Sequence, residues 1–422
     1  MKRKLSALAV AAALIYGFSA PASAQFVSNV SQDGADNQAE VSQHGFFGGV
    51  QTVTVNQSGT GNQANAEQAN TRATNATITQ SGSANVASTL QESIGESNAS
   101  ISQSGSANQA SIHQVWQLSG SAAITQNGTS HTAAINQLPP VANGVDPRSD
   151  FSSATVNQIG GSANSATINQ IGVNTSGPGN GASATINQLD ATANSATINQ
   201  NPNSMRSQAS ITQRDGAANN NAAVNQSGVD NSASIVQGLT PGQGPVGSSS
   251  ALVNQTGQAN SASLSQLSGG GNTGTIIQNG ASNVASATQI AFDSLASINQ
   301  SGDGNTASVS QNFVLGHTAT VLQTGTGNHA GIVQDGFNSV SKTASVTQNG
   351  SGNNANVHQD GSFNDATILQ NGSANVATIN QIGLGTGASH NTASITQTGS
   401  GSVASIAQSG GSGNHANVVQ NP

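Results

Sequence analysis

Hydrophobic and polar residues alternate along this chain in a short unit that repeats almost from end to end. The unit reads Asn-x-Ala-x-Ile-x-Gln followed by x-Gly-x-x, so its marked positions are two residues apart. A period of two is typical of a β-strand; it places Asn, Ala, Ile and Gln on one face and the intervening Ser, Thr and Asn on the other. A glycine two residues after Gln can adopt the positive φ of a tight turn, so each strand is expected to end there.

The Gln of this unit recurs 32 times between Gln32 and Gln420, and it sets the register of the repeat. Of the 31 intervals between successive marked Gln residues, 15 are 11 residues long and 8 are 12. Four residues before Gln the chain has Ala, with Ser28, Val53 and Gly274 as the exceptions. A helical period would scatter these positions around an axis, so the pattern predicts strands and excludes a helical repeat.

A strand of seven residues with a four-residue arc buries little by itself, so the units must stack. Two successive units make one coil of 22–24 residues, and 32 units make about 16 coils. The predicted fold is all-β: a β-solenoid with two facing parallel sheets, amyloid-like, and roughly 75 Å tall at about 4.8 Å per coil. Burial of each Ile or Val in its thin core contributes about 1.5–3 kcal/mol. Examples of the expected core residues are Ala110, Ile112, Ala307, Val309, Ala377 and Ile379.

In such a stack each Gln lies above the next Gln and each Asn above the next Asn. Their side-chain amides carry both a donor and an acceptor, so they can satisfy one another along the stack. The positions expected to form these amyloid ladders are Gln32, Asn37, Gln43, Gln80, Asn85, Gln91, Ser97, Gln103, Asn108, Gln114, Ser249, Gln255, Asn260, Gln266, Ser294, Gln300, Asn305, Gln311, Gln370, Asn375, Gln381, Gln408, Asn414 and Gln420.

The arcs on the two edges of the stack differ in length. Every other interval is 11 residues from position 32 to 137 and again from 226 to 408, whereas the intervals between them vary. One edge is therefore tight and the other accepts insertions, with irregular stretches around 138–152, 173–182 and 238–250. The alternation changes phase between these two regions. Either a degenerate strand lies hidden near 141–149, or the insertion-bearing edge changes sides; Pro147, which removes a ladder donor, favours the second explanation.

Residues 1–24 are typical of a secretory signal peptide. Three basic residues precede an apolar run over residues 5–18, and small residues end at Ala24, so cleavage is expected between Ala24 and Gln25. An uncleaved membrane anchor is the alternative, but the run is short for a membrane-spanning helix. Without the leader, 5 basic residues oppose 16 acidic ones, a net charge of 5 − 16 = −11. No basic patch remains that would bind nucleic acid.

Composition excludes several further classes of protein. Only 3% of residues are aromatic and 34% are hydrophobic, too few for a thick globular core, and the absence of Cys excludes disulfides. The eight His residues are scattered singly and no Ser has a matched base and acid, so neither a metal or cofactor site nor an enzyme is predicted. Trp116 and most Phe residues fall in arcs, where they either cap the core or form adhesive contacts.

The repeat resembles the curlin repeat of curli, a bacterial functional amyloid with the pattern Ser-x5-Gln-x4-Asn-x5-Gln. Three complete matches begin at Ser97, Ser249 and Ser294, and partial matches cover nearly all of residues 25–422, although the chain has about three times the usual number of repeats. The resemblance implies a secreted subunit, more like the major subunit, that polymerises into extracellular fibres of the biofilm matrix at the bacterial surface. It also implies a nucleator subunit, an outer-membrane secretion channel and periplasmic chaperones as partners.

The ends of the predicted stack suggest how such a polymer would form. Gln32, Asn37 and Gln43 are expected at one end, and Gln408, Asn414 and Gln420 at the other, each beside unpaired strand edges. The hypothesis is that each end templates the strands of the next subunit. Two other functions stay open: a surface adhesin that does not polymerise, and an ice-binding solenoid, for which the outward rows mix Ser, Thr and Asn too freely.

Overall fold

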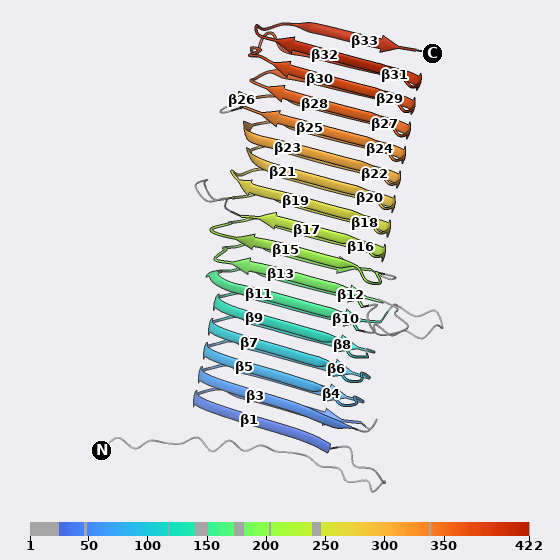
Figure 1. The fold of residues 1–422 in the computed structure, drawn as a ribbon. Coiled ribbons are helices and arrows are strands. Elements are labelled where there is room, and N and C mark those ends of the chain that lie inside the picture. Colours follow the sequence, from blue (N-terminus) through green and yellow to red (C-terminus); the bar gives the residue numbers. More distant parts are fainter. Residues whose placement is uncertain are drawn as a thin grey trace, which may run out of the picture.

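The computed structural model describes residues 25–45, 49–116, 118–139, 151–172, 181–201, 204–238, 246–336 and 339–421. In these residues every regular element is a strand, and the strands stack as a β-solenoid of about 16 coils (Figure 1). The predicted fold is confirmed. The chain climbs the stack from β1 at one end to β33 at the other, so the two ends of the described chain lie at opposite ends of the stack (Figure 1).

Two parallel sheets form the solenoid, and the chain alternates between them. Sheet A contains β1 (Gln25–Ala35), β3 (Val50–Thr60), β5 (Asn75–Ser83), β7 (Asn98–Ser106), β9 (Ser121–Thr129), β11 (Ser153–Ser162), β13 (Ser183–Leu189), β15 (Gln208–Arg214), β17 (Ser232–Gln237), β19 (Ser261–Ser268), β21 (Val284–Phe292), β23 (Thr306–Leu315), β25 (His329–Asp335), the two-residue β26 (Ser339–Val340), β28 (Asn354–Asp360), β30 (Val376–Ile382) and β32 (Val403–Ser409). Sheet B contains β2 (Gln38–His44), β4 (Gln63–Ala69), β6 (Val86–Glu92), β8 (Gln109–Val115), β10 (Thr132–Leu138), β12 (Ser165–Ile171), β14 (Ser195–Gln200), β16 (Asn221–Val229), β18 (Ser250–Gln258), β20 (Thr273–Ala281), β22 (Leu295–Asp303), β24 (Thr318–Thr326), β27 (Thr343–Ser351), β29 (Asn364–Ser373), β31 (Asn391–Ser400) and β33 (His415–Gln420).

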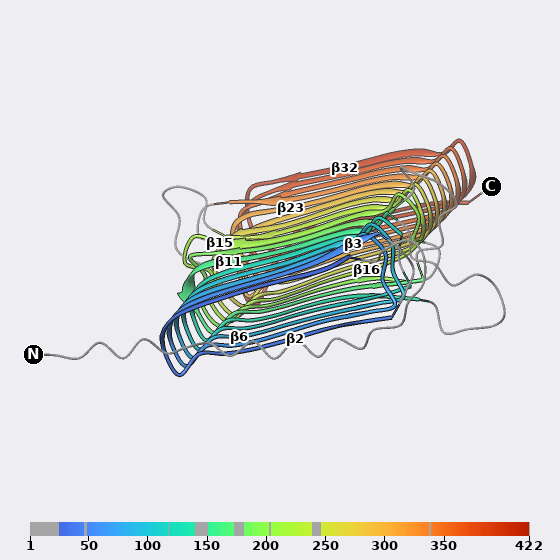
Figure 2. The same ribbon diagram turned by 90° about the horizontal axis from the view of Figure 1, so that it is seen from below.

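The register within each sheet follows the repeat. Between β12 and β14, for example, Ala166 pairs with Ala196, Ile168 with Ile198, and Gln170 with Gln200. A view along the stack shows the two sheets facing each other, joined by arcs at both edges (Figure 2). Because a slip of one residue would turn every core side chain outward, the period-two pattern fixes this register.

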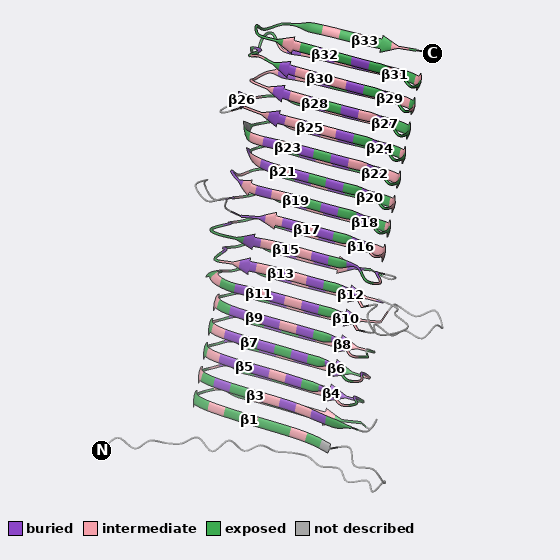
Figure 3. Cartoon of the chain, viewed as in Figure 1, coloured by how far each residue is buried: buried purple, intermediate pink, exposed green. Residues whose placement is uncertain are grey.

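The core lies between the sheets and consists of the Ala and Ile/Val/Leu rows. Burial alternates along each strand as the pattern predicts (Figure 3). The six core residues named from the sequence are all buried: Ala110, Ile112, Ala307, Val309, Ala377 and Ile379. The same rows are only partly buried in β1, β2 and β33, at Val30, Ala39, Val41, Ala416 and Val418, because a coil is present on one side only.

The tight edge of the solenoid changes sides along the stack. We call the arcs that lead from sheet A to sheet B the AB edge, and the return arcs the BA edge. The AB edge has the 11-residue spacing from Gln32 to Gln137, and the BA edge has it from Gln226 onward. Residues 141–149 lie outside the described residues, but β9 pairs directly with β11 and β10 with β12. No strand is therefore inserted between these coils, and the interpretation of a changed edge is confirmed.

Glycine makes the tight arcs possible. Gly82 has φ 101° and pairs with Gly59 and Gly105 in a continuous glycine row. A Cβ atom at Gly82 would lie 2.0 Å from the backbone oxygen of Gly105, so a side chain would force the coils apart. The strands of the tight edge consequently extend through this glycine and pair along the arc.

The predicted signal peptide, residues 1–24, lies outside the described residues, as do most of the three irregular stretches. Within the described ranges, no helix is long and apolar enough to span a membrane.

Candidate assembly surfaces

The marked Gln side chains form two unbroken ladders, one in each sheet. In all 30 steps Nε2 of one Gln donates to Oε1 of the Gln in the next coil, at 2.7–3.0 Å. The donor always belongs to the residue nearer the N-terminus. Each ladder is therefore directional. The amide proton that bonds to the next Gln always points toward the C-terminal end of the stack.

In every marked Gln except Gln32, Nε2 also donates to the backbone across the solenoid. Gln103 Nε2 donates to the carbonyl of Val86 at 3.0 Å, and Gln80 Nε2 donates to the carbonyls of Gln63 and Asn85 at 2.9 and 3.0 Å. These bonds join the strand ends across the solenoid. The Gln row thus links coils to one another and sheet A to sheet B.

The Asn side chains form a second kind of ladder, along the tight edge. Asn85 donates from Nδ2 to the carbonyls of Ser81 and Gly105, at 3.0 and 3.1 Å. Its backbone N–H donates to Oδ1 of Asn62 at 3.1 Å, and Asn108 does the same to Oδ1 of Asn85. One Asn side chain therefore binds carbonyls of its own arc and of the next coil, which holds the arc at its shortest length.

The Ser of the repeat marks the loose edge. Ser97 lies on the BA edge, where its hydroxyl accepts the N–H of Gly120 at 3.0 Å. Ser249 and Ser294 lie on the AB edge, and their hydroxyls accept the N–H groups of Asn272 and His317. In the first half, the first Gln of each repeat thus lies in sheet A and the second in sheet B. In the second half, the first Gln lies in sheet B and the second in sheet A. The sequence positions named above fall accordingly into two Asn rows: Asn37, Asn85 and Asn108 on the AB edge, with Asn414 at its far end, and Asn260, Asn305 and Asn375 on the BA edge.

A protein-family comparison agrees with this reading. The model of the curlin associated repeat matches residues 269–302 and 343–368. The chain therefore contains curlin associated repeats. Both matched segments contain an intact Gln–Asn–Gln series, Gln278–Asn283–Gln289 and Gln348–Asn353–Gln359, in coils whose tight edge is the BA edge. A search of curated proteins found no match.

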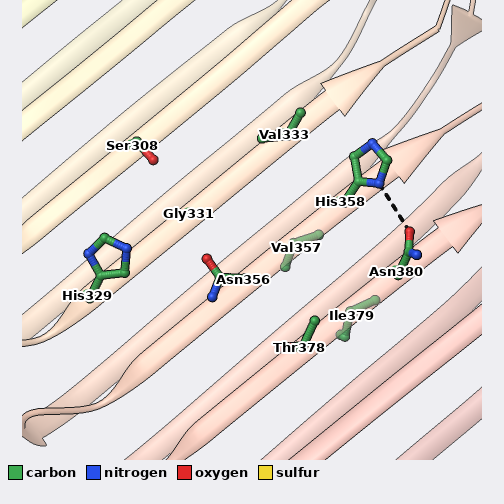
Figure 4. A pocket seen from close by; sticks show the side chains of 10 residues that line it. All are labelled: Ser308, His329, Gly331, Val333, Asn356, Val357, His358, Thr378, Ile379 and Asn380. Atoms are coloured by element: carbon green, nitrogen blue, oxygen red, sulfur yellow. Dashed lines mark hydrogen bonds between the residues drawn. The ribbon is translucent and has the colours of Figure 1, made fainter.

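The matched repeat and the β-solenoid fold are of a structural kind, and the described residues hold no group of three or more His, Asp or Glu side chains that could bind a metal ion. One depression, of about 360 Å³, lies on the outer face of sheet A (Figure 4). It arises because Gly331 interrupts an outward row occupied by Ser308 and Asn356 on the flanking strands. Beside it, His358 Nδ1 lies 3.1 Å from Oδ1 of Asn380.

Three coils carry a buried titratable side chain six residues before the marked Gln on the AB edge: His131 at an Asn position of the first half, and His317 and Lys342 at Ser positions of the second half. Lys342 Nζ donates to the carbonyls of Asp335 and Gln359. In the next coil Asn364 donates to the carbonyl of Asp360, which is the residue paired with Asp335. Lys342 thus binds the equivalent carbonyl of its own arc. Burial lowers the pKa of Lys342 to about 8, against the opposing effect of Asp360 and Asp335. Burial, and then the charge of Lys342, lowers the pKa of His317 to about 4. Burial also lowers the pKa of His131. Sequence reasoning did not anticipate the burial of Lys342, whose charge argues for the surface.

The two ends of the stack present different groups. At the N-terminal end Gln32 and Gln43 use Nε2 to bind the next coil, so their Oε1 atoms face outward, and Ser28 Oγ donates to Gln43 Oε1 at 2.6 Å. At the C-terminal end Gln408 and Gln420 accept through Oε1 and have one amide proton bound to the carbonyls of Thr392 and Val403. Their second amide protons point out of the stack.

Proposed function

We propose that this chain is a secreted structural subunit that assembles end to end into curli-like amyloid fibres of the extracellular matrix, and that these fibres mediate adhesion and aggregation at the bacterial surface. The observation that carries the proposal is the complementarity of the two ends. One end offers Gln oxygens and the other offers Gln amide protons, along the same two rows.

Stacking a second copy in register would continue every ladder. Gln408 Nε2 would donate to Oε1 of the next copy's Gln32, and Gln420 Nε2 to that of its Gln43. Asn414, whose N–H donates to Asn391 Oδ1 at 3.0 Å, would offer its own Oδ1 to the N–H of the next Asn37. Half-exposed core residues, such as Val30 and Val418, would become buried. Each new junction would therefore resemble the inside of the solenoid.

The direction of the ladders makes this growth polar. Two N-terminal ends placed together would set Gln oxygen against Gln oxygen, and two C-terminal ends would set amide against amide. Only unlike ends fit, and a contact between unlike surfaces that does not close on itself generates an open filament. Among the described strands, β1, β2, β32 and β33 pair on one side only, so each copy has an edge to offer at both ends.

Export and assembly partners form part of the same proposal. The leader-like residues 1–24 support secretion, and the curlin repeats support a nucleator subunit, an outer-membrane channel and periplasmic chaperones as partners. A monomeric adhesin or an ice-binding solenoid would not form fibres with increasing concentration, which separates both from this proposal.

Seeded fibre growth followed by an amyloid dye tests the function. Gln32, Gln43, Gln408 and Gln420 are replaced by Ala, which removes the ladder groups of both ends. The matched control replaces one outward residue in each of the same four end strands by Ala: Ser31, Ser42, Ser405 and Asn417. The expected result is slow growth of the end variant and normal growth of the control. Equal growth of the two variants would contradict the proposal.

A further inference from the structure

The aromatic side chains of this chain follow the loose edge, whichever side that edge is on. In the first half Trp116 and Phe151 lie in arcs of the BA edge. In the second half Phe292, Phe313 and Phe363 lie in arcs of the AB edge. Phe26 at the start of β1 also belongs to the BA side, while Phe46, Phe47 and Phe337 lie outside the described residues. The rings therefore change sides together with the insertions.

The tight arcs have the opposite character. Their four-residue sequences are built from Gly, Ser, Thr, Asn, Ala, Asp and Gln, as in Ser-Gly-Ser-Ala (81–84) and Thr-Gly-Thr-Gly (324–327), and Val229 is their largest aliphatic residue. Each edge of the solenoid thus carries aromatic residues over one half of the stack and none over the other, and the aromatic half of the BA edge also carries the exposed Arg72–Glu96 ion pair.

The aromatic residues of the loose edges, and some aliphatic residues beside them, are exposed enough to form contacts. On the AB edge, Phe292 is 55% exposed, Phe313 47% and Leu384 68%; we call these three residues, with Leu315 and Ile382, the AB stripe. On the BA edge, Trp116 is 46% exposed and Phe151 is half-buried; we call these two the BA stripe. Clustered exposed apolar side chains in a chain with so few of them mark an interaction surface.

We propose that the AB stripe of one copy binds the BA stripe of a second copy, so that neighbouring fibres associate side by side, AB edge against BA edge. This inference rests on the proposed fibre. A second copy fits because the two edges carry matching patterns along the axis. If one parallel fibre is shifted by about 8 coils, roughly 38 Å, arcs with aromatic residues meet arcs with aromatic residues, and tight arcs meet tight arcs.

The shift predicts which residues meet. Trp116 follows Gln114 in the fourth coil, and Phe313 follows Gln311 in the twelfth, 12 − 4 = 8 coils further along. Trp116 of one copy is therefore expected to face Phe313 of another. Because the AB and BA edges are different surfaces, the contact is not self-paired, and it can repeat from fibre to fibre into a flat bundle rather than stop at a pair.

Surface substitutions test the pairing in fibres of the full chain. The edge variant is Phe292→Ser, Phe313→Ser and Leu384→Ser. The control is Val86→Ser, Val284→Ser and Val376→Ser, three exposed valines on the flat outer faces and away from the end strands. Electron microscopy and low-speed sedimentation measure bundling, and an amyloid dye measures elongation. We expect normal elongation of both variants and a roughly tenfold loss of bundled material for the edge variant alone, since the weak contacts act many times along a fibre. Unchanged bundling of the edge variant, or an equal loss in the control, would overturn the proposal.

Cross-linking tests the shift and does not depend on the edge variant folding. The chain has no Cys, so single Trp116→Cys, Phe313→Cys and Leu384→Cys variants each carry one thiol. Mixed Trp116→Cys and Phe313→Cys chains should form more disulfide-linked pairs than Trp116→Cys mixed with Leu384→Cys, which lies three coils further along. Equal yields, or a preference for pairs of like variants, would overturn the shift. A purified chain that never forms fibres would contradict the proposed function instead, and the same cross-linking would then test the edge contact between single copies.

Discussion

Replacing one buried Gln of a ladder should lower the free energy of unfolding more than the small change in side-chain volume suggests. Gln300→Leu in β22 is the clearest case. Gln300 is fully buried; its Oε1 accepts from Gln278 at 2.9 Å, and its Nε2 donates to Gln323 Oε1 at 2.8 Å and to the carbonyl of Val284 at 3.0 Å. Leu has a similar volume, so the change removes hydrogen bonds without a large cavity. Two buried amide groups, of Gln278 and Gln323, then lack a partner, at about 1–3 kcal/mol each or roughly 2–6 kcal/mol in total, and the part-buried carbonyl of Val284 also loses its bond to Gln300.

The control for this change is Asn299→Leu, the same amide-to-leucine replacement one residue away. Asn299 lies on the outer face of the same strand and is exposed, so its amide keeps water as an alternative partner. Urea denaturation of freshly purified chain, followed by far-UV circular dichroism, should show a large loss of stability for Gln300→Leu and little change for Asn299→Leu. Similar unfolding midpoints for the two variants would refute the reasoning that the ladder stabilises the coils.

Two further predictions concern single positions. Gly302→Ala would place a Cβ 2.1 Å from the backbone oxygen of Gly325, whereas Gly304→Ala would meet open space, although both glycines have positive φ (106° and 65°). Gly304→Ala should therefore cost only the backbone strain of about 1–3 kcal/mol, and Gly302→Ala clearly more in the same urea assay; equal losses would contradict the role given to the glycine row. The pKa of His317 is lowered from 6.5 to about 4, so the unfolded chain binds the proton at a higher pH than the folded chain. The free energy of unfolding should therefore fall by up to roughly 3 kcal/mol as the pH falls through that interval. His317→Asn should show a smaller loss of urea midpoint between pH 7 and pH 4.5, and an unchanged loss would show that His317 is not the cause.

The strands, their faces and their register could be predicted because the pattern is both periodic and simple. Ala and Ile two residues apart, as at Ala166 and Ile168, leave one choice of inward face. The change of the tight edge was visible in the spacing of Gln alone. Pro147 favoured it over a hidden strand, and the direct pairing of β9 with β11 confirmed it.

Other features depend on three-dimensional detail that the pattern does not carry. The direction of the Gln ladders is a choice between two amide orientations that sequence letters do not distinguish. Lys342 is buried because carbonyls of two coils replace its water, and that replacement requires the arc geometry around Asp335. The exposure of Phe313 likewise follows from arc shape, although its place in an arc was evident.

The most direct test of end-to-end assembly is a cryo-electron microscopy reconstruction of fibres grown from the purified chain. The account predicts one uninterrupted stack in which β33 of one copy lies beside β2 of the next, with Gln420 next to Gln43, and a strand spacing of about 4.8 Å across the junction. Like ends meeting, or ladders that break between copies, would contradict it.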